Sequence, residues 1–139
     1  DVLAITGHVQ AKRRAGRVDG VQQVEVAIKD PHLGVNLAGL DVRPIRSAME
    51  RWRPSRAEVV VADPARSGLR REGVAAIDRT GAEVCVLVSC DLGALGRDAR
   101  LLRAAGFDHA GSTVVDLFGH TGQVEVVSAF ARPRPARPR

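Results

Sequence analysis

The sequence is poor in large aromatic residues and in cysteine. It has no tyrosine, and Trp52 is its only tryptophan. One such residue cannot form a platform on which nucleic-acid bases stack, so we expect Trp52 to pack in the core. The two cysteines, Cys85 and Cys90, are an odd number of residues apart, which puts them on opposite faces of a shared strand. This spacing argues against a disulfide between them and favours a reducing, cytoplasmic setting.

Long apolar runs and paired metal ligands are also missing. No run approaches the roughly 20 residues of a membrane-spanning helix, and no leader resembles a signal peptide. The four histidines are scattered, and no cysteine–histidine spacing is typical of zinc. We therefore expect neither a membrane nor a metal partner. Because the chain begins with Asp1 and not with methionine, we interpret it as an N-terminally truncated domain.

Positive charge is concentrated at one end of the chain. The formal net charge is +5, and the last eight residues, RPRPARPR, contain four arginines and no acid. Their prolines exclude them from a sheet interior, so we predict a domain over 1–131 followed by a disordered arm over 132–139. Such an arm is explained equally well by solubility and by contact with phosphate.

Apolar, β-branched runs alternate with helical patterns, which is typical of α/β proteins. The tight link GHTG makes the last two strands antiparallel, because parallel neighbours need a longer crossover. We therefore predict a Rossmann-like, mostly parallel sheet with helices on both faces and an antiparallel last strand. Pro44 places its strand at an edge. The expected strands are 1–5, 17–24, 41–45, 58–62, 83–90, 107–118 and 123–132, and the expected helices are 26–40, 71–81 and 91–106.

Several reactive side chains follow or begin predicted strands. Ligands bind open α/β sheets at the carboxyl ends of the strands. Asp63 and Cys90 stand at two such ends, and His120 and Glu125 flank the last turn. A thiol beside carboxylates is a candidate covalent site. The alternative interpretations are a small buried hydrophobe for Cys90 and a solvated strand residue for Glu125.

Three motifs occur in order along the second half of the chain: DPARSGL (63–69), LVSCDLGALGRDARLL (87–102) and VVDLFGHTGQVEVV (114–127). They resemble the C-terminal motifs of the RNA (uracil-5-)methyltransferases, whose patterns are Asp-Pro-Pro-Arg-x-Gly, Ser-Cys-Asn-Pro-x-x-x-x-Arg-Asp and Asp-x-Phe-Pro-x-Thr-x-His-x-Glu. The resemblance implies a class I methyltransferase fold, S-adenosylmethionine as cofactor and methyl donor, and transfer or ribosomal RNA as partner.

The resemblance also implies roles for individual residues. Cys90 is the nucleophile that adds to C6 of a uracil, and Glu125 is the base that removes the proton from C5. Asp63 lies in the pocket for the cofactor and the target base. Arg97 and Asp98 match the family's Arg-Asp pair and are expected to support the loop that carries the cysteine.

The cofactor-binding half departs from the family pattern. Gly7 and Gln22 match cofactor-binding positions, but glutamine replaces the usual glutamate, and Ile5 stands where the family has a second glycine. A β-branched residue does not readily adopt positive φ, so we expect a different loop there. In the cysteine motif, Asp91 replaces asparagine and is expected to cap the next helix. We interpret His120 as a turn residue or an RNA contact.

Three functional interpretations remain open on the sequence. The first is the active-site domain of an RNA uracil-5 methyltransferase. The second is a folded but inert relative that binds RNA through its arginines. The third is another Rossmann-like enzyme whose motif matches are coincidental.

Overall fold

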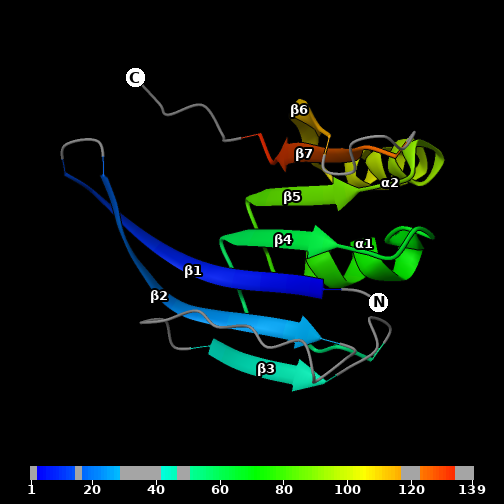
Figure 1. Ribbon diagram of the computed structural model, residues 1–139. Helices are drawn as coiled ribbons and strands as arrows, with labels where there is room; N and C mark the ends of the chain where they lie inside the picture. The colour runs from blue at the N-terminus through cyan, green and yellow to red at the C-terminus, as the bar shows by residue number, and fades with distance from the viewer. Residues whose placement is uncertain (1–2, 15–16, 29–41, 47–50, 117–122, 134–139) are drawn as a thin grey trace.

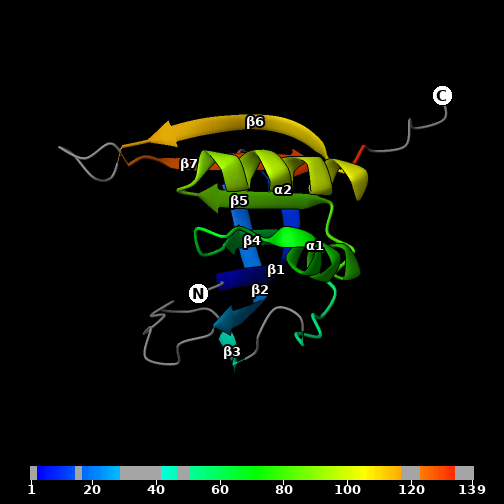
Figure 2. The same ribbon diagram turned by 90° about the vertical axis from the view of Figure 1, so that its right-hand side faces the viewer.

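In the described part of the computed structural model, seven strands form one sheet, and two helices cover one of its faces (Figures 1 and 2). The structure describes residues 3–14, 17–28, 42–46, 51–116 and 123–133, with side chains for the last two of these ranges. The elements are, in chain order, β1 (Leu3–Arg14), β2 (Arg17–Ile28), β3 (Val42–Arg46), β4 (Val59–Asp63), α1 (Arg70–Arg79), β5 (Val84–Ser89), α2 (Leu92–Ala104), β6 (Asp108–Val115) and β7 (Glu125–Ala131).

The strands lie in the order β3-β2-β1-β4-β5-β7-β6. β7 is antiparallel to both of its neighbours, and β3 lies at an edge, as predicted. The sheet is mixed and not mostly parallel, because only β2–β3 and β4–β5 are parallel pairs. The difference arises in β1, which is antiparallel to both of its neighbours. It forms a hairpin with β2, and it also runs antiparallel to β4.

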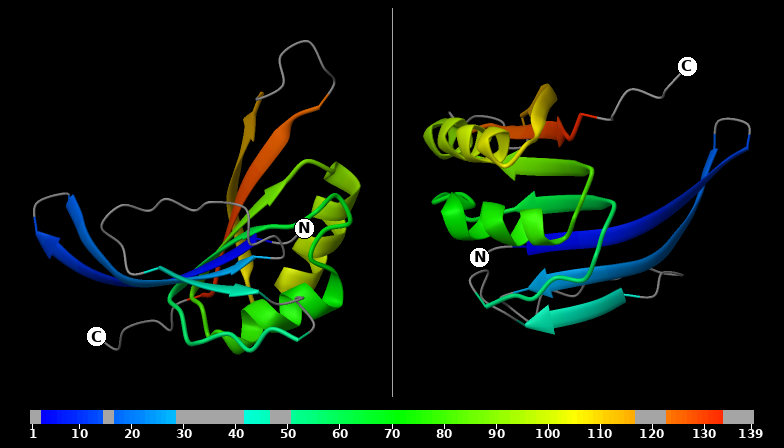
Figure 3. Two further views of the ribbon diagram at one scale, coloured as in Figure 1. Left: turned by 60° about the horizontal axis from the view of Figure 1, so that its bottom comes forward. Right: turned by 180° about the vertical axis from the view of Figure 1, so that it is seen from behind.

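Both described helices lie on the same face of the sheet, and the β1–β2 hairpin extends away from them (Figure 3). Within the described residues, the expectation of helices on both faces is therefore not met. α1 connects β4 to the parallel neighbour β5, as a helical crossover does. The helix predicted over 26–40 starts inside β2, which continues to Ile28, and residues 29–41 lie outside the described residues.

The core lies between the two helices and the sheet. Along β5, burial alternates strictly, with Cys85 and Leu87 fully buried under the helices and the valines between them only half-buried. Trp52 is 1% exposed and Phe107 is fully buried, so the packing role expected of the tryptophan is confirmed. One face of β4, β5 and β7 thus carries the core, and the other face points away from the helices.

Arg132 ties the end of β7 to the ends of both helices. Its Nε donates to the main-chain oxygen of Ala82 at 3.1 Å, and its Nη1 donates to that of Ala105 at 2.8 Å. Its Nη2 forms an ion pair with Asp78. The prediction that the arm begins at Arg132 is therefore wrong for that residue, and the arm from residue 134 onward lies outside the described residues.

Candidate active site at the carboxyl edge of the sheet

Asp63, Cys90 and Glu125 share one edge and one face of the sheet. Asp63 ends β4 and Cys90 follows β5, and these parallel strands have their carboxyl ends at the same edge. Glu125 begins the antiparallel β7 at that edge. In each strand the alternate positions are the ones buried under the helices. The alternation therefore places all three residues on the face that points away from α1 and α2.

The register between β5 and β7 brings the predicted nucleophile and base together. Their last paired residues are Ser89 and Val126. Cys90 follows Ser89 and Glu125 precedes Val126, so both predicted residues stand next to the last pair of this register. Glu125 is half-buried, and it pairs on its other side with Val115 of β6. Two residues far apart in the sequence thus lie at the same end of the β5–β7 pair.

The two cysteines have different surroundings. Cys85 is 0% exposed, and burial raises the pKa of its thiol to about 12. A thiol with such a pKa stays protonated at neutral pH and is unreactive. Cys90 is half-buried at the end of the strand. The core role expected of Cys85 is confirmed, and any covalent chemistry falls to Cys90.

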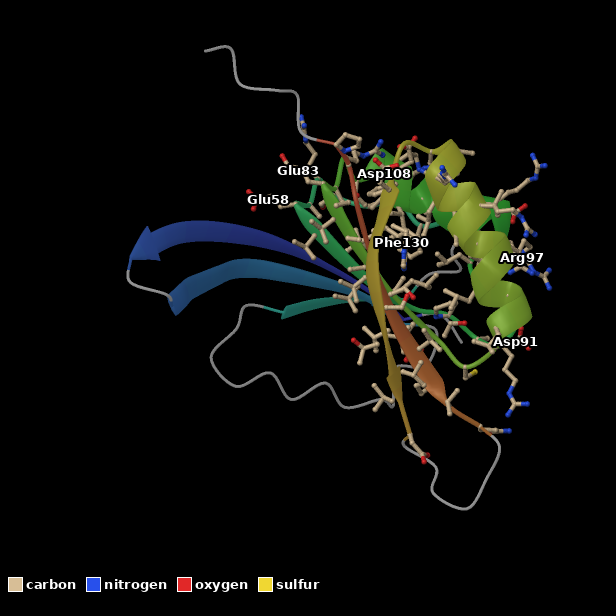
Figure 4. The ribbon with its side chains drawn as sticks, turned by 90° about the horizontal axis from the view of Figure 1, so that it is seen from above. Glu58, Glu83, Asp91, Arg97, Asp108 and Phe130 are labelled. Atoms are coloured by element: carbon tan, nitrogen blue, oxygen red, sulfur yellow. The ribbon has the colours of Figure 1, made fainter. Side chains whose placement is uncertain are left out.

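The turn that carries Cys90 is fixed by the residues on either side. The carboxylate of Asp91 accepts a hydrogen bond from the main-chain nitrogen of Ala94 at 2.7 Å, so the predicted N-cap is confirmed. The hydroxyl of Ser89 donates to the main-chain oxygen of Asp91 at 3.0 Å. These bonds hold the passage from β5 into α2 at one end of that helix (Figure 4).

Arg97 and Asp98 hold a different loop from the one expected. The Asp98 carboxylate is 1% exposed and accepts hydrogen bonds from the main-chain nitrogens of Leu69, at 2.6 Å, and Arg70, at 3.1 Å. Arg97 donates to the main-chain oxygen of Ser67 at 2.6 Å and pairs with Asp98 at 2.9 Å. The pair therefore fixes the loop after β4, and the expectation that it supports the cysteine loop is corrected.

Gly68 permits this close approach, a role that the sequence did not reveal. Its φ is +73°, in the region that favours glycine. A Cβ at this position would lie 2.2 Å from Oδ2 of Asp98 and 2.4 Å from Nη2 of Arg97. The glycine of the first motif and the Arg-Asp pair of the second are thus one contact. In the sequence the glycine and the Arg-Asp pair stand in separate motifs, and neither motif indicates that they are in contact.

Asp63 lies on β4, the strand next to the one that leads to Cys90. Its side chain is exposed, yet part of the carboxyl group is shielded from water, and this desolvation raises its pKa above the ordinary value of 3.8. A carboxyl group at the carboxyl end of a strand is well placed to contact a bound ligand.

The residues predicted to bind the cofactor are not all at this edge. Gly7 pairs with Val59, the first residue of β4, whereas Asp63 is the last, about 13 Å away at 3.3 Å per residue. Gln22 lies on β2, still further along the hairpin. β1 continues through Ile5 and Gly7, so a strand stands where a different loop was expected from Ile5. The predicted set is therefore divided between Asp63 at the edge and two residues in the hairpin.

His120 lies outside the described residues. Among the residues that are described, no group of three histidine, cysteine, aspartate or glutamate side chains could hold a metal ion. Neither of the two described helices is long and apolar enough to cross a membrane.

Comparison with known proteins points to one class of enzyme. No family model matches the chain. An RNA methyltransferase of Caldanaerobacter subterraneus is 33% identical over 129 residues, which cover 88% of this chain and 28% of that protein. The 23S rRNA (uracil(1939)-C(5))-methyltransferase RlmD of Hahella chejuensis is 31% identical over 134 residues, covering 94% of this chain and 28% of that enzyme. The chain thus spans less than a third of these relatives.

Solved structures agree with these sequence relatives. The tRNA (uracil-54, C5)-methyltransferase of Pyrococcus abyssi, in complex with S-adenosyl-L-homocysteine, aligns with a TM-score of 0.56 at 25% identity. The match covers 66% of this chain and 22% of that enzyme. A structure from Thermoplasma acidophilum aligns with a TM-score of 0.51 at 15% identity and supports the fold alone. The α/β class is confirmed, and the chain is homologous to part of the RNA (uracil-5-)methyltransferases.

Proposed function

We propose that the chain forms the catalytic edge of an S-adenosylmethionine-dependent RNA (uracil-5-)methyltransferase, with Cys90 as nucleophile and Glu125 as base. The observation that supports this most is the β5–β7 register, whose last pair, Ser89 and Val126, stands next to Cys90 on one strand and Glu125 on the other. The names of the relatives support uracil C5 in transfer or ribosomal RNA as the target. The S-adenosylhomocysteine bound to the Pyrococcus enzyme supports S-adenosylmethionine as methyl donor. We also propose that the protein acts in the cytoplasm.

The proposed chemistry uses the thiol to make C5 nucleophilic. The Cys90 thiolate adds to C6 of the uracil, and the electron pair of the C5–C6 double bond moves into an enolate. C5 of the enolate attacks the methyl group of S-adenosylmethionine. The bond between the methyl carbon and the sulfonium sulfur breaks, and S-adenosylhomocysteine leaves. Glu125 then removes the C5 proton, which is acidified by the neighbouring carbonyl. The electrons of that bond re-form C5–C6 and expel the thiolate.

The remaining site residues have binding roles in this proposal. We assign Asp63 to the target base or the donor, because it shares the edge and the face of Cys90. By homology, Gly7 and Gln22 are assigned to the methyl donor, and His120 is assigned to the RNA. No step is assigned to a metal.

A covalent adduct tests the nucleophile. RNA containing 5-fluorouridine carries fluorine where the base must remove a proton, so the reaction stops at the protein–RNA adduct. We expect mass spectrometry to detect this adduct in the presence of S-adenosylmethionine. Cys90→Ala should abolish it, whereas Cys85→Ala serves as the matched control and should retain it. Adduct formation by the Cys90→Ala variant would exclude the proposed role.

A second variant tests the base with ordinary RNA. With Glu125→Gln, addition and methyl transfer proceed but the C5 proton stays, so the methylated covalent intermediate should accumulate. Release of free 5-methyluridine RNA by this variant at the wild-type rate would eliminate Glu125 as the base.

An inert relative that binds RNA is the second candidate function. The continuous strand through Gly7 favours it, because no glycine loop forms there to approach a donor. This candidate predicts that the full chain binds RNA but forms no adduct with 5-fluorouridine RNA under any donor concentration.

A further inference from the structure

Five exposed arginines are carried by the loop after β4 and by the two described helices. We call this group the arginine face, and it consists of Arg66, Arg70, Arg71, Arg100 and Arg103. All five are exposed, and among the described residues none of their side chains has a hydrogen-bond or ion-pair partner. Nitrogen-tipped side chains project outward here, around the labelled Arg97 (Figure 4).

Most acids of the same elements are already used within the fold. The Asp98 carboxylate is bound by Arg97 and two main-chain nitrogens. Asp91 caps α2, and Asp78 is paired with Arg132. Glu72 is the exposed acid of α1 that has no such partner among the described residues. After internal pairing, the arginine face therefore has a clear excess of positive charge.

The arginine face lies on the helical side of the sheet, whereas Asp63, Cys90 and Glu125 lie on the other side. It comes near the proposed active edge at Arg66, Arg70 and Arg71, where the loop after β4 leads into α1. Arg97 and Asp98 bind the loop that leads from β4 into α1, so α2 lies against the first turn of α1. The same α2 begins at Leu92, two residues after Cys90. Arg70 has a φ of +56°, and its main-chain nitrogen is held by Asp98. A left-handed backbone is unfavourable for a residue other than glycine, and here the hydrogen bond to Asp98 fixes the point from which the exposed Arg70 side chain projects.

We propose that the arginine face binds the sugar–phosphate backbone of the RNA that flanks the target uridine. This inference rests on the proposed function, which places the uridine at Cys90. Guanidinium groups match phosphate geometry with two parallel hydrogen bonds. The chain has no tyrosine, and its one tryptophan is buried, so neither residue type can form a stacking platform here, and the exposed arginines favour contact with phosphate. Binding through this face is therefore strongly salt-dependent.

A charge-matched pair of triple variants tests the location. The first is Arg70→Ala/Arg71→Ala/Arg100→Ala. The control, Arg51→Ala/Arg53→Ala/Arg56→Ala, removes the same charge at the opposite end of α1, where Arg79 donates to the main-chain oxygen of Trp52. The end of α1 lies about 15 Å from its start at 1.5 Å per residue. Binding of the full chain to a fluorescein-labelled, uridine-containing single-stranded RNA is followed by anisotropy over a series of KCl concentrations.

The first variant should weaken binding on the order of tenfold at physiological salt and lower the slope of log K against log salt by about 2. The control should change binding by less than about threefold, because its arginines make no phosphate contact in the proposed complex. Equal losses in both variants would show that net charge alone drives binding and would overturn the proposal. No loss in the first variant would overturn it as well. Circular dichroism checks that both variants remain folded.

The proposal can fail separately from the proposed function. Binding that depends on the arginine face, without any adduct to 5-fluorouridine RNA, would refute the enzymatic function and retain the surface. An adduct that forms equally fast in wild type and the first variant at limiting RNA would retain the function and refute the surface.

Discussion

The two ends of the helical layer are held by charged side chains of opposite sign. At the carboxyl edge the central group is a carboxylate, Asp98, which accepts from two main-chain nitrogens and from Arg97. At the amino edge the central group is a guanidinium, Arg132, which donates to Ala82 and Ala105. Glu58 and Glu83 mark the second edge and Asp91 the first in Figure 4.

The difference follows from which backbone groups a helix leaves unpaired at each end. The start of α1 presents free N–H groups, which an anion satisfies, and the end of α2 presents free carbonyls, which a cation satisfies. The carboxylate at the first edge is 1% exposed, whereas the Arg132 side chain is 30% exposed and its partner Asp78 54%. We therefore expect the contact beside the proposed active site to be worth more than the one at the far edge.

Asp98→Ala is expected to have the largest effect on stability. It leaves two main-chain nitrogens and the Arg97 guanidinium without their buried acceptor, at a cost of about 3–5 kcal/mol. Urea denaturation monitored by circular dichroism measures the change. Glu72→Ala, an exposed acid without a described partner, is the control and should stay within about 0.5 kcal/mol. Similar effects of the two substitutions would show that the buried contacts of Asp98 stabilise the fold no more than an exposed acid does.

Gly68→Ala should follow at about 2–4 kcal/mol, from a strained positive φ and displacement of a hydrogen-bonded carboxylate. The added Cβ meets Asp98 at 2.2 Å. Gly96→Ala is the same substitution inside α2, with no atom within 4 Å, and it should stabilise by about 0.5–1 kcal/mol. Thermal unfolding distinguishes the two, and a stabilising Gly68→Ala would contradict the described contact.

Arg132→Ala should cost about 1–2 kcal/mol, less than Asp98→Ala because water partly replaces the lost bonds. The guanidinium carbon also lies 4.2 Å from the ring centre of Phe107, a contact that adds to the loss. Arg132→Lys keeps the charge but not the planar fork, so it should recover less than half of the loss. Full recovery by lysine, measured by urea denaturation, would show that charge alone acts at this edge.

The last comparison concerns the reactivity of two thiols, that of Cys85 within β5 and that of Cys90 just after it. Iodoacetamide should modify Cys90 in the native protein and spare Cys85, which is 0% exposed, whereas both should react in urea. Peptide mass spectrometry identifies the modified residue, and Cys90→Ala should leave the native protein unlabelled. Native labelling of Cys85 would contradict its place in the core.

The buried thiol also predicts a pH dependence. The pKa of Cys85 is raised to about 12 in the fold from 9.0. Above pH 9 the unfolded chain therefore loses this proton before the folded chain does, and stability falls as the pH rises toward 12. Cys85→Val keeps an apolar side chain and should flatten this part of the profile of unfolding free energy against pH.

Local pattern predicted the second half of the chain well. The helices and strands from Val59 onward begin and end within two or three residues of their predicted bounds, because burial alternation and caps such as Asp91 are local signals. The first half was predicted less well. The strand expected at 1–5 continues to Arg14 and pairs with β2, since pairing partners are chosen by tertiary contacts that periodicity does not contain.

The sequence by itself determined the chemistry available to this protein: a thiol at a strand end, carboxylates at two others, and three motifs typical of RNA (uracil-5-)methyltransferases. Tertiary structure decided which of these groups meet. The β5–β7 register ends beside Cys90 and Glu125, and the packing of α2 against the loop after β4 brings Asp98 to Gly68. The physical reason is that strand register and helix packing are set by burial of whole faces. No single motif specifies that burial.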